Sequence, residues 1–213
     1  MCETSSKDYC LIQKDVIKFI CQIDPAFKVL LEKFPIYPLT GLPAEFDPFE
    51  SLVETIIRQQ LSGKAAQTII GRVKQSIAIN PEFISKIDVE QLRKYGLSQA
   101  KAKTIKELAA ALLGGLDLSE INQLDEIQIR DSLTQIWGIG NWTVDMFLMF
   151  ELIHPDVWPV NDLGVQKGWQ KLHSLPTRPT PNNLLTSGDK FPGIRSAVAW
   201  YCWRALEENS KEK

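Results

Sequence analysis

Residues 133–145 read LTQIWGIGNWTVD, which predicts a helix, a tight turn through Gly138, Ile139 and Gly140, and a second helix. The two glycines allow backbone angles that are closed to other residues, and they keep side chains away where something must approach closely. Backbone amides in such a turn and at the following helix start can hold an anion such as a phosphate. Glycine is also the usual residue of an ordinary turn between packed helices. The turn alone therefore leaves both interpretations open.

Helical periodicity continues on the N-terminal side of this segment. Asp47-Pro48 places a capping residue before a proline, a combination typical of a helix start. Apolar residues then recur at helical spacing: Phe49, Leu52, Val53, Ile56 and Ile57. Further helix starts are expected at capping residues along the chain: Ser62, Asn80, Asp88, Ser98 and Asp125.

The C-terminal side is also helical. Residues 141–152 are apolar on nearly every face, which predicts a buried central helix. Another helix begins at Asn161 or Asp162 and runs to about His173, and a proline-rich stretch separates it from a last helix over 194–205. No stretch alternates convincingly with period two, so the expected fold class is all-α, with about ten helices.

Composition narrows the class of protein. Of the 213 residues, 44% are hydrophobic and 23% charged, as is ordinary for a soluble globular protein. The net charge of −2 argues against a protein that coats nucleic acid by charge alone, although it allows a small local DNA footprint. The spacing of the four cysteines (Cys2, Cys10, Cys21, Cys202) predicts free thiols and no metal centre or cofactor. Without a membrane span or a secretory signal, we expect the cytoplasm (the bacterial nucleoid) or a eukaryotic nucleus.

Five segments together resemble one family. In order they are FESLVETIIRQQLSGKAA (49–66), GLSQAKAKTI (96–105), WGIGNWTVD (137–145), WPVNDLGVQKG (158–168) and RSAVAWYCWR (195–204). Their order and spacing resemble the helix-hairpin-helix DNA glycosylases, specifically the compact, yeast-type members of the 3-methyladenine DNA glycosylase II family. The resemblance implies two helical subdomains flanking an active-site cleft. Residues 46–155 would end in the hairpin (126–152), residues 156–213 would carry the catalytic aspartate, and residues 1–45 would pack on the latter.

The resemblance assigns the catalytic carboxylate to Asp162. An aspartate at a helix start is otherwise a common N-cap, and the two roles are compatible because the helix dipole favours an ionised carboxylate. Asn161 is the alternative cap. Asp145 competes as a carboxylate, but its place just after the hairpin is explained by the dipole of that helix. Strand-cutting relatives carry a lysine where this chain has Trp142, so no amine is available there for a Schiff base. The resemblance therefore implies a monofunctional glycosylase.

The resemblance also implies a DNA-inserting loop and a base pocket. The loop comprises Gln59, Gln60, Leu61 and Ser62, with Gln60 or Leu61 as the wedge, although Leu61 could equally pack at a helix end. The pocket would be lined by Trp142, Met146, Leu163 and Ile194. Trp142 would stack on a cationic base, or it could be a core aromatic. Expected DNA contacts are Lys64, Lys101, Gly138, Ile139, Gly140, Asn141 and Arg195, although basic residues such as these three are more often solvated surface charges. In the family, the carbonyls matching Thr134, Ile136 and Ile139 can hold a monovalent cation.

The implied activity is hydrolysis of the N-glycosidic bond of alkylated purines (N3-methyladenine, N7-methylguanine) in double-stranded DNA by a monomer. The base is flipped out first, and Asp162 then stabilises the oxocarbenium sugar and orients or deprotonates water. Two other classes stay open. A non-catalytic helix-hairpin-helix DNA-binding module would keep the turn but not need Asp162, and an all-α scaffold protein would need neither.

Overall fold

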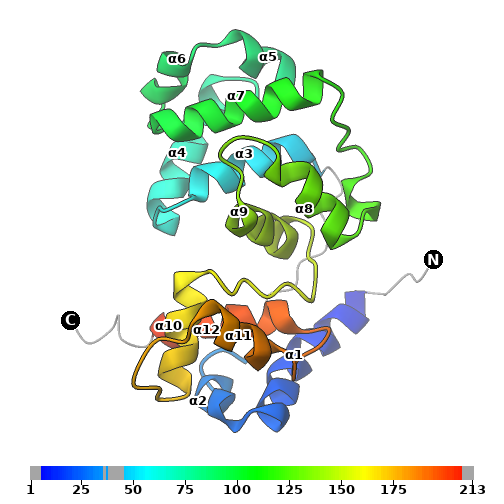
Figure 1. The fold of residues 1–213 in the computed structure, drawn as a ribbon, viewed down its shortest axis with the longest axis vertical. Helices are drawn as coiled ribbons and strands as arrows, with labels where there is room; N and C mark the ends of the chain where they lie inside the picture. Colours follow the sequence, from blue (N-terminus) through cyan, green and yellow to red (C-terminus); the bar gives the residue numbers. More distant parts are fainter. Residues whose placement is uncertain (1–5, 36, 38–45, 208–213) are drawn as a thin grey trace. The chain divides into compact units, whose positions relative to one another are not determined.

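The computed structural model describes residues 6–35, 37 and 46–207, and side chains from residue 15 onward. Over these ranges the chain is helical with no strand, which confirms the all-α prediction. The chain divides into two compact units (Figure 1). One comprises residues 42–152 and the other comprises residues 1–41 together with 153–213. The division falls after Leu152, a few residues before the boundary expected at 155.

The unit formed by residues 42–152 contains seven α-helices and two short segments in its described part. They are α3 (Pro48–Arg58), α4 (Gly63–Ser76), α5 (Pro81–Lys86), α6 (Val89–Lys94), α7 (Gln99–Leu113), the 3₁₀ turn η2 (Ile121–Gln123), α8 (Glu126–Thr134), α9 (Asn141–Met146) and the π-helical η3 (Phe147–Glu151). The expected capping residues all stand at helix starts: Asp47, Ser62, Asn80, Asp88, Ser98 and Asp125. Local side-chain-to-amide bonds therefore set these boundaries.

The segment 141–152 is buried, as predicted, but it is not one regular α-helix. After α9 the backbone widens into η3, and the amide of Leu152 donates to the carbonyl of Phe147. Phe147, Leu148 and Met149 are buried, whereas Phe150 is 45% exposed. A π-helical turn adds a residue to the helical turn, so the apolar run from 147 to 150 does not bury every side chain.

The other unit contains α1 (Ser6–Ile23), η1 (Pro25–Phe27), α2 (Lys28–Leu31), α10 (Leu163–Leu172), α11 (Pro181–Gly188) and α12 (Arg195–Glu207). The helix α11 was missed in the sequence because its stretch is rich in proline and polar residues. Pro181 stands at the first helical position, after the cap Thr180, where a missing amide has no penalty. This stretch is therefore partly helix and not only a linker.

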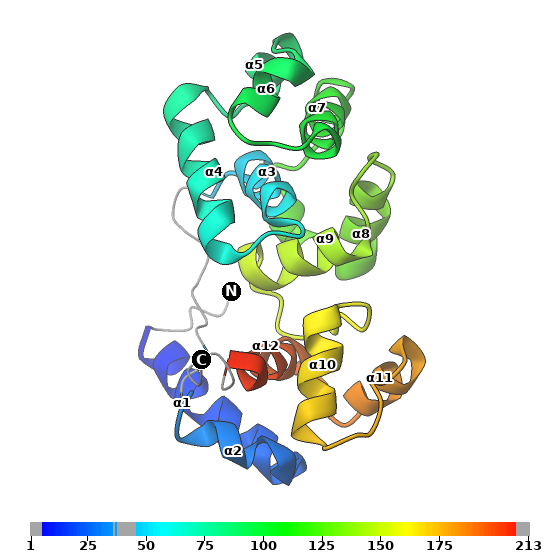
Figure 2. The same ribbon diagram turned by 90° about the vertical axis from the view of Figure 1, so that its left-hand side faces the viewer.

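Helices α10 and α12 pack closely against each other (Figure 2). A Cβ on Gly168 would lie 1.9 Å from the carbonyl oxygen of Cys202, so the two backbones touch where only glycine fits. Cys202 is fully buried and, like Cys21, is a free thiol, as expected. Cys2 and the side chain of Cys10 lie outside the described residues. This contact fixes the start of α10 relative to α12.

A buried carboxylate joins the N-terminal helices to α10 and α11. Asp24 is 6% exposed, and its Oδ1 accepts a hydrogen bond from the Ala26 amide at 3.0 Å. Its Oδ2 accepts the Lys190 ammonium at 2.7 Å and lies 2.8 Å from His173 Nε2. Burial alone would raise the pKa of Asp24, but the bonds from Lys190 and His173 outweigh it and hold the pKa below its ordinary value. The cluster therefore stabilises the unit while Asp24 is ionised.

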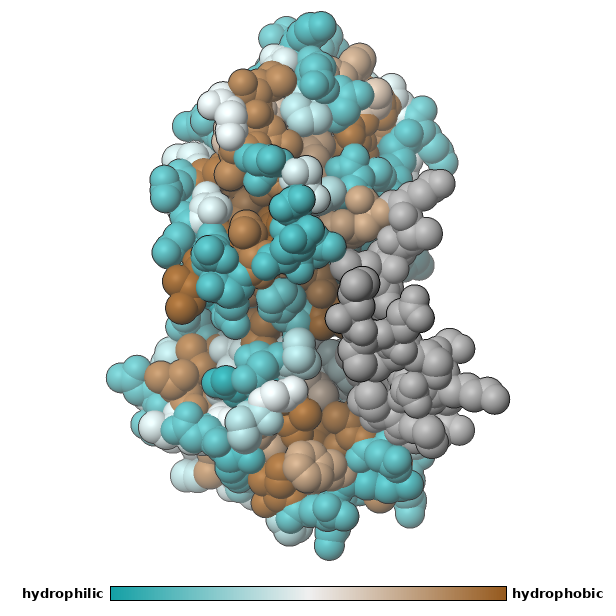
Figure 3. Space-filling view, turned by 90° about the vertical axis from the view of Figure 1, so that its right-hand side faces the viewer, coloured by the Kyte–Doolittle hydropathy of each residue, from teal (hydrophilic) through white to brown (hydrophobic). Residues whose placement is uncertain are grey.

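The described residues contain neither a candidate membrane span nor a candidate metal centre. None of the helices in the described ranges is long and apolar enough to cross a bilayer, and no group of three or more metal-binding side chains gathers among those residues. On the face in Figure 3, hydrophobic residues form patches separated by hydrophilic ones.

Candidate active site and DNA-contacting hairpin

The predicted hairpin is present between α8 and α9 (Figure 1). Ile139, 3% exposed, anchors the turn in the core, and its amide donates to the carbonyl of Ile136 at 3.0 Å. Gly140 is the N-cap of α9, and its carbonyl accepts the amide of Thr143 at 2.9 Å. The amides of Gly140 and Asn141 thus stand at the start of a helix, where an anion can be bound. The carbonyl of Ile136 accepts the Ile139 amide within the turn, and its place in the expected cation site stays a prediction.

The two hairpin glycines have different roles. Gly138 has a φ of +86°, and a Cβ there would lie 1.9 Å from Thr104 Oγ1 of α7. Gly140 has a φ of −103°, and a Cβ there would meet no atom within 4 Å. The missing side chain of Gly138 therefore makes room for Thr104, and a contact of the Gly138 backbone with DNA stays a prediction. Gly140 alone borders open space.

The predicted DNA-inserting loop links α3 to α4. Gln59 ends α3, Gln60 adopts a left-handed φ of +55°, and the Ser62 hydroxyl accepts the Ala65 amide to cap α4. Gln60 is exposed and Leu61 is 38% exposed. The alternative that Leu61 packs at a helix end is not favoured, because that would bury it. Lys64 is exposed in the first turn of α4, as a phosphate contact requires.

Two of the basic residues expected to contact DNA are occupied within the protein. The Lys101 ammonium donates to the carbonyls of Ile57 (2.8 Å) and Gln59 (2.6 Å), and burial lowers its pKa. The Arg195 guanidinium pairs with both carboxylate oxygens of Asp156, at 2.7 and 2.6 Å. Each cation thus already has acceptors within the protein, and a contact of either residue with a DNA phosphate stays a prediction.

Asp162 is the N-cap of α10, so the alternative cap Asn161 is wrong. Its Oδ1 accepts the Val165 amide at 2.7 Å and the Trp203 indole N–H at 2.8 Å, and the residue is 9% exposed. Two donors from α10 and α12 thus fix the orientation of one carboxylate. The indole has room because residue 164 is a glycine, where a Cβ would lie 2.6 Å from the Trp203 ring.

Trp203 is the site residue that sequence reasoning missed. It lies in the segment RSAVAWYCWR that carries the resemblance, 41 residues after Asp162. Its spacing in that segment predicts only a helical face, and three of the ten residues there are aromatic. Only the packing of α12 on α10 brings its N–H to the carboxylate.

The competing carboxylate, Asp145, is explained by a side-chain partner and not by the helix dipole. It is 7% exposed and pairs with Arg130 of α8 at 2.8 Å. The guanidinium of Arg130 also pairs with Glu126 at 2.6 Å and donates to the Asn141 side chain at 3.3 Å. These bonds join the two helices of the hairpin, so Asp145 has a structural role.

The four expected pocket residues fall on the two units. Trp142, half-buried, and Met146, 9% exposed, lie one turn apart on α9. Leu163, 47% exposed, directly follows Asp162, and Ile194, half-buried, precedes α12. Two of the four residues thus lie in each unit, and the pocket itself stays a prediction.

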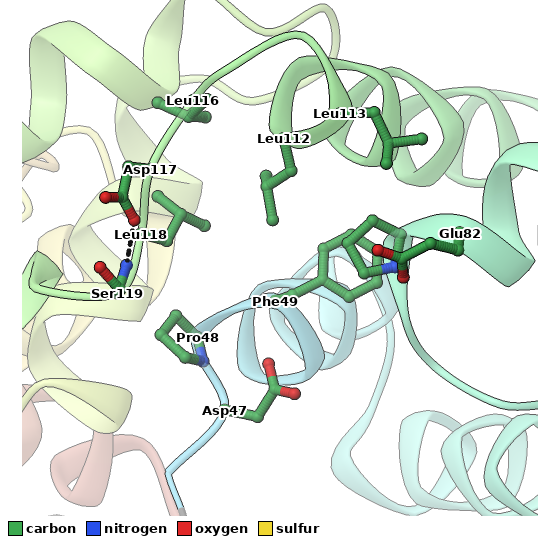
Figure 4. A pocket seen from close by; sticks show the side chains of 11 residues that line it. Asp47, Pro48, Phe49, Glu82, Leu112, Leu113, Leu116, Asp117, Leu118 and Ser119 are labelled. Carbon is green, nitrogen blue, oxygen red and sulfur yellow. Dashed lines mark hydrogen bonds between the residues drawn. The ribbon is translucent and has the colours of Figure 1, made fainter.

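A separate hollow of about 360 Å³ lies at the N-terminal end of α3 (Figure 4). Its wall is apolar at Phe49, Leu112 and Leu118, and the carboxylates of Glu82 and Asp117 also line it. None of the predicted site residues lines this hollow. Its carboxylates would repel phosphate, which separates it from the hairpin and the loop.

Residues 53–191 match the HhH-GPD superfamily of base excision DNA repair proteins. The chain belongs to this superfamily. Among curated relatives, DNA-3-methyladenine glycosylase 1 of Schizosaccharomyces pombe is 39% identical over 165 residues, which cover 74% of this chain and 72% of that protein. The alkylbase DNA glycosidase-like protein mag2 of the same yeast is 29% identical over 194 residues, covering 88% of this chain and 91% of that protein.

Solved structures of this superfamily agree with the fold. The S. pombe 3-methyladenine DNA glycosylase Mag1 in complex with abasic DNA superposes with a TM-score of 0.83 at 32% identity, covering 93% of this chain and all of that one. A DNA-3-methyladenine glycosidase of Bacillus halodurans gives 0.73 at 32% identity, covering 92% and 91%. The resemblance predicted from the five segments is confirmed. The HhH-GPD match stops at residue 191, so it includes Asp162 but not Trp203.

Proposed function

We propose that this protein is a monofunctional DNA glycosylase that removes alkylated purines, N3-methyladenine and N7-methylguanine, from double-stranded DNA and leaves an abasic site. One observation carries the proposal. Asp162 presents a nearly buried carboxylate that is oriented by the Val165 amide and the Trp203 indole. The similarity to the yeast and bacterial 3-methyladenine glycosylases supports the choice of substrate.

Asp162 acts by charge. An alkylated purine such as N3-methyladenine is cationic, so its glycosidic bond is already weakened and little general acid is required. As the bond breaks, positive charge develops on the sugar, and a fixed carboxylate stabilises it without reorganising. The same group orients or deprotonates the attacking water. The two hydrogen bonds to Oδ1 hold the carboxylate before the base arrives.

The absence of strand cleavage is part of the proposal. Strand-cutting relatives use a lysine two residues after the second hairpin glycine, and this chain has Trp142 there. Without that amine no Schiff base forms at this position. The abasic product therefore stays intact, and borohydride should trap no covalent complex with lesion DNA. A trapped complex would contradict the monofunctional assignment.

The experiment compares Asp162→Asn with Asp88→Asn. Asparagine caps a helix as well as aspartate, so both variants keep their caps and lose one charge at a helix start. Asp162→Asn should slow single-turnover release of N7-methylguanine by at least about 100-fold, the scale of losing a main electrostatic stabiliser. Asp88→Asn, at the start of α6, should release base like the parent. Equal rates for all three proteins would refute the assignment, and binding to abasic DNA without base release by the parent would favour a non-catalytic DNA-binding module.

A further inference from the structure

The first turn of α7 contacts the backbone at the start of the predicted DNA-inserting loop. The ammonium of its Lys101 donates to the carbonyls of Ile57 and Gln59, which stand at the C-terminal end of α3. A cation at a helix C-terminus also offsets the negative end of the helix dipole. The ammonium therefore holds the backbone directly before Gln60 and Leu61.

A second set of bonds ties the same loop to the hairpin. The Gln59 side-chain amide donates to the hydroxyl of Thr143 at 2.8 Å and to the carbonyl of Gly138 at 3.4 Å. Thr143 is 3% exposed, so this contact lies at the edge of the core. Thr104, one turn after Lys101 on α7, fills the space at Gly138. The α7 helix thus supports both the loop and the hairpin.

The loop needs such support because its own conformation is unfavourable. Gln60 adopts a left-handed φ of +55°, which a side chain other than glycine takes up only where its surroundings impose it. Gln60 and Leu61 are exposed, so burial does not fix them. Fixing the backbone on either side of an exposed wedge lowers the entropy lost when it enters DNA.

We infer that Lys101 is a positioning residue for base flipping, which holds the Gln59–Ser62 loop ready to fill the gap left by the extruded nucleotide. The inference rests on the proposed function. It does not require Lys101 to contact DNA, because the ammonium acts through the carbonyls of Ile57 and Gln59.

A second lysine on the same helix provides the matched control. Lys106 donates to the carbonyls of Ser85 (3.0 Å) and Ile87 at the end of α5. The chemistry is the same, an ammonium from α7 that caps a preceding helix, but α5 carries none of the predicted DNA contacts. Lys101→Met and Lys106→Met therefore remove equivalent bonds, and only the first releases the loop.

The test measures flipping separately from chemistry. With 2-aminopurine placed next to an N7-methylguanine in a duplex, Lys101→Met should lower the flipping signal and slow single-turnover release at least tenfold. Release from the same lesion in a single strand should change less than twofold, because no stacked duplex has to be opened. Lys106→Met should keep parental values in both assays, and Lys101→Arg, which also donates to carbonyls, should recover part of the duplex rate. Thermal melting should fall by similar amounts in the two methionine variants.

Two outcomes would overturn the inference. One is an equal loss on duplex and single strand for Lys101→Met, which would place the defect in the chemistry or in the fold. The other is a duplex defect in Lys106→Met as large as that in Lys101→Met. If the parent releases no base at all, the proposed function fails. The flipping signal, measured in an Asp162→Asn background, still decides whether Lys101 holds the loop.

Discussion

The two hairpin glycines have different surroundings, so alanine should lower stability at position 138 and DNA affinity at position 140. At position 138, alanine must adopt a φ of +86°, which costs about 1–2 kcal/mol for an L-residue. Its Cβ must also displace Thr104, whose Oγ1 would lie 1.9 Å away, and overpacking costs about 1–3 kcal/mol. Together these give a destabilisation of about 2–5 kcal/mol, or about 5–20 °C in Tm for a chain of this length.

At position 140 the same substitution should leave stability almost unchanged. The φ of −103° suits any residue, and the new Cβ would meet nothing within 4 Å. If the amides at this helix start bind a DNA phosphate, the added methyl group obstructs the approach. Loss of one charge-assisted hydrogen bond costs about 1.5–3 kcal/mol, so affinity for abasic DNA should fall about tenfold or more.

Differential scanning calorimetry and fluorescence anisotropy with abasic duplex measure the two effects. A double variant, Gly138→Ala with Thr104→Ala, removes the Oγ1 and Cγ2 atoms and should recover part of the lost Tm through a positive coupling energy. A Gly138→Ala protein as stable as the parent, or a Gly140→Ala protein with parental DNA affinity, would refute the division of roles.

Three further predictions concern Asp162, the base pocket and the buried carboxylate. Trp203→Phe keeps an aromatic ring but loses the indole N–H bond to Asp162. A hydrogen bond to a charged group is worth about 1.5–3 kcal/mol, so kcat should fall about 10–100-fold with unchanged KM and abasic-DNA affinity. Trp142→Ala would remove the expected cation–π contact, worth about 2 kcal/mol, or about thirtyfold in rate, so excision of N3-methyladenine should slow by that factor. Trp142→Phe should retain part of the parental rate. The parent should release neutral hypoxanthine far more slowly than N3-methyladenine. Asp24→Asn should lower stability by about 2 kcal/mol at pH 7, less than the usual loss for a broken buried pair because its partners His173 and Lys190 are part-exposed. Because the pKa of Asp24 is lowered in the folded protein, its contribution is present above pH 4 and disappears as the pH falls further, so parent and variant should converge in Tm at acid pH.

Local signals in the sequence predicted most of the helix boundaries. Caps such as Asp47, Ser62 and Asn80 act through their own neighbours, so the sequence contains the whole interaction. The helix α11 was missed because proline and polar residues are also typical of linkers, and only the cap at Thr180 distinguishes the two. Predictions that depend on a distant partner were less reliable. Lysine and arginine patterns do not reveal whether a cation faces a phosphate, a carbonyl or a carboxylate, so the protein acceptors of Lys101 and Arg195 could not be predicted from the sequence.

The same limit explains why the hairpin motif was only half understood. In the sequence, Gly138 and Gly140 are equivalent members of one short pattern. In the structure, Gly138 packs against the protein and Gly140 borders open space. The contacts of Gly138 come from Thr104 and Gln59, which lie 34 and 79 residues before it in the sequence. Asp162 differs because its cap bond to the Val165 amide lies within three residues, and this local bond already orients the side chain. The family resemblance in the sequence was therefore enough to assign the catalytic candidate, whereas the contacts of Trp203 with Asp162 and of Lys101 with the loop required the fold.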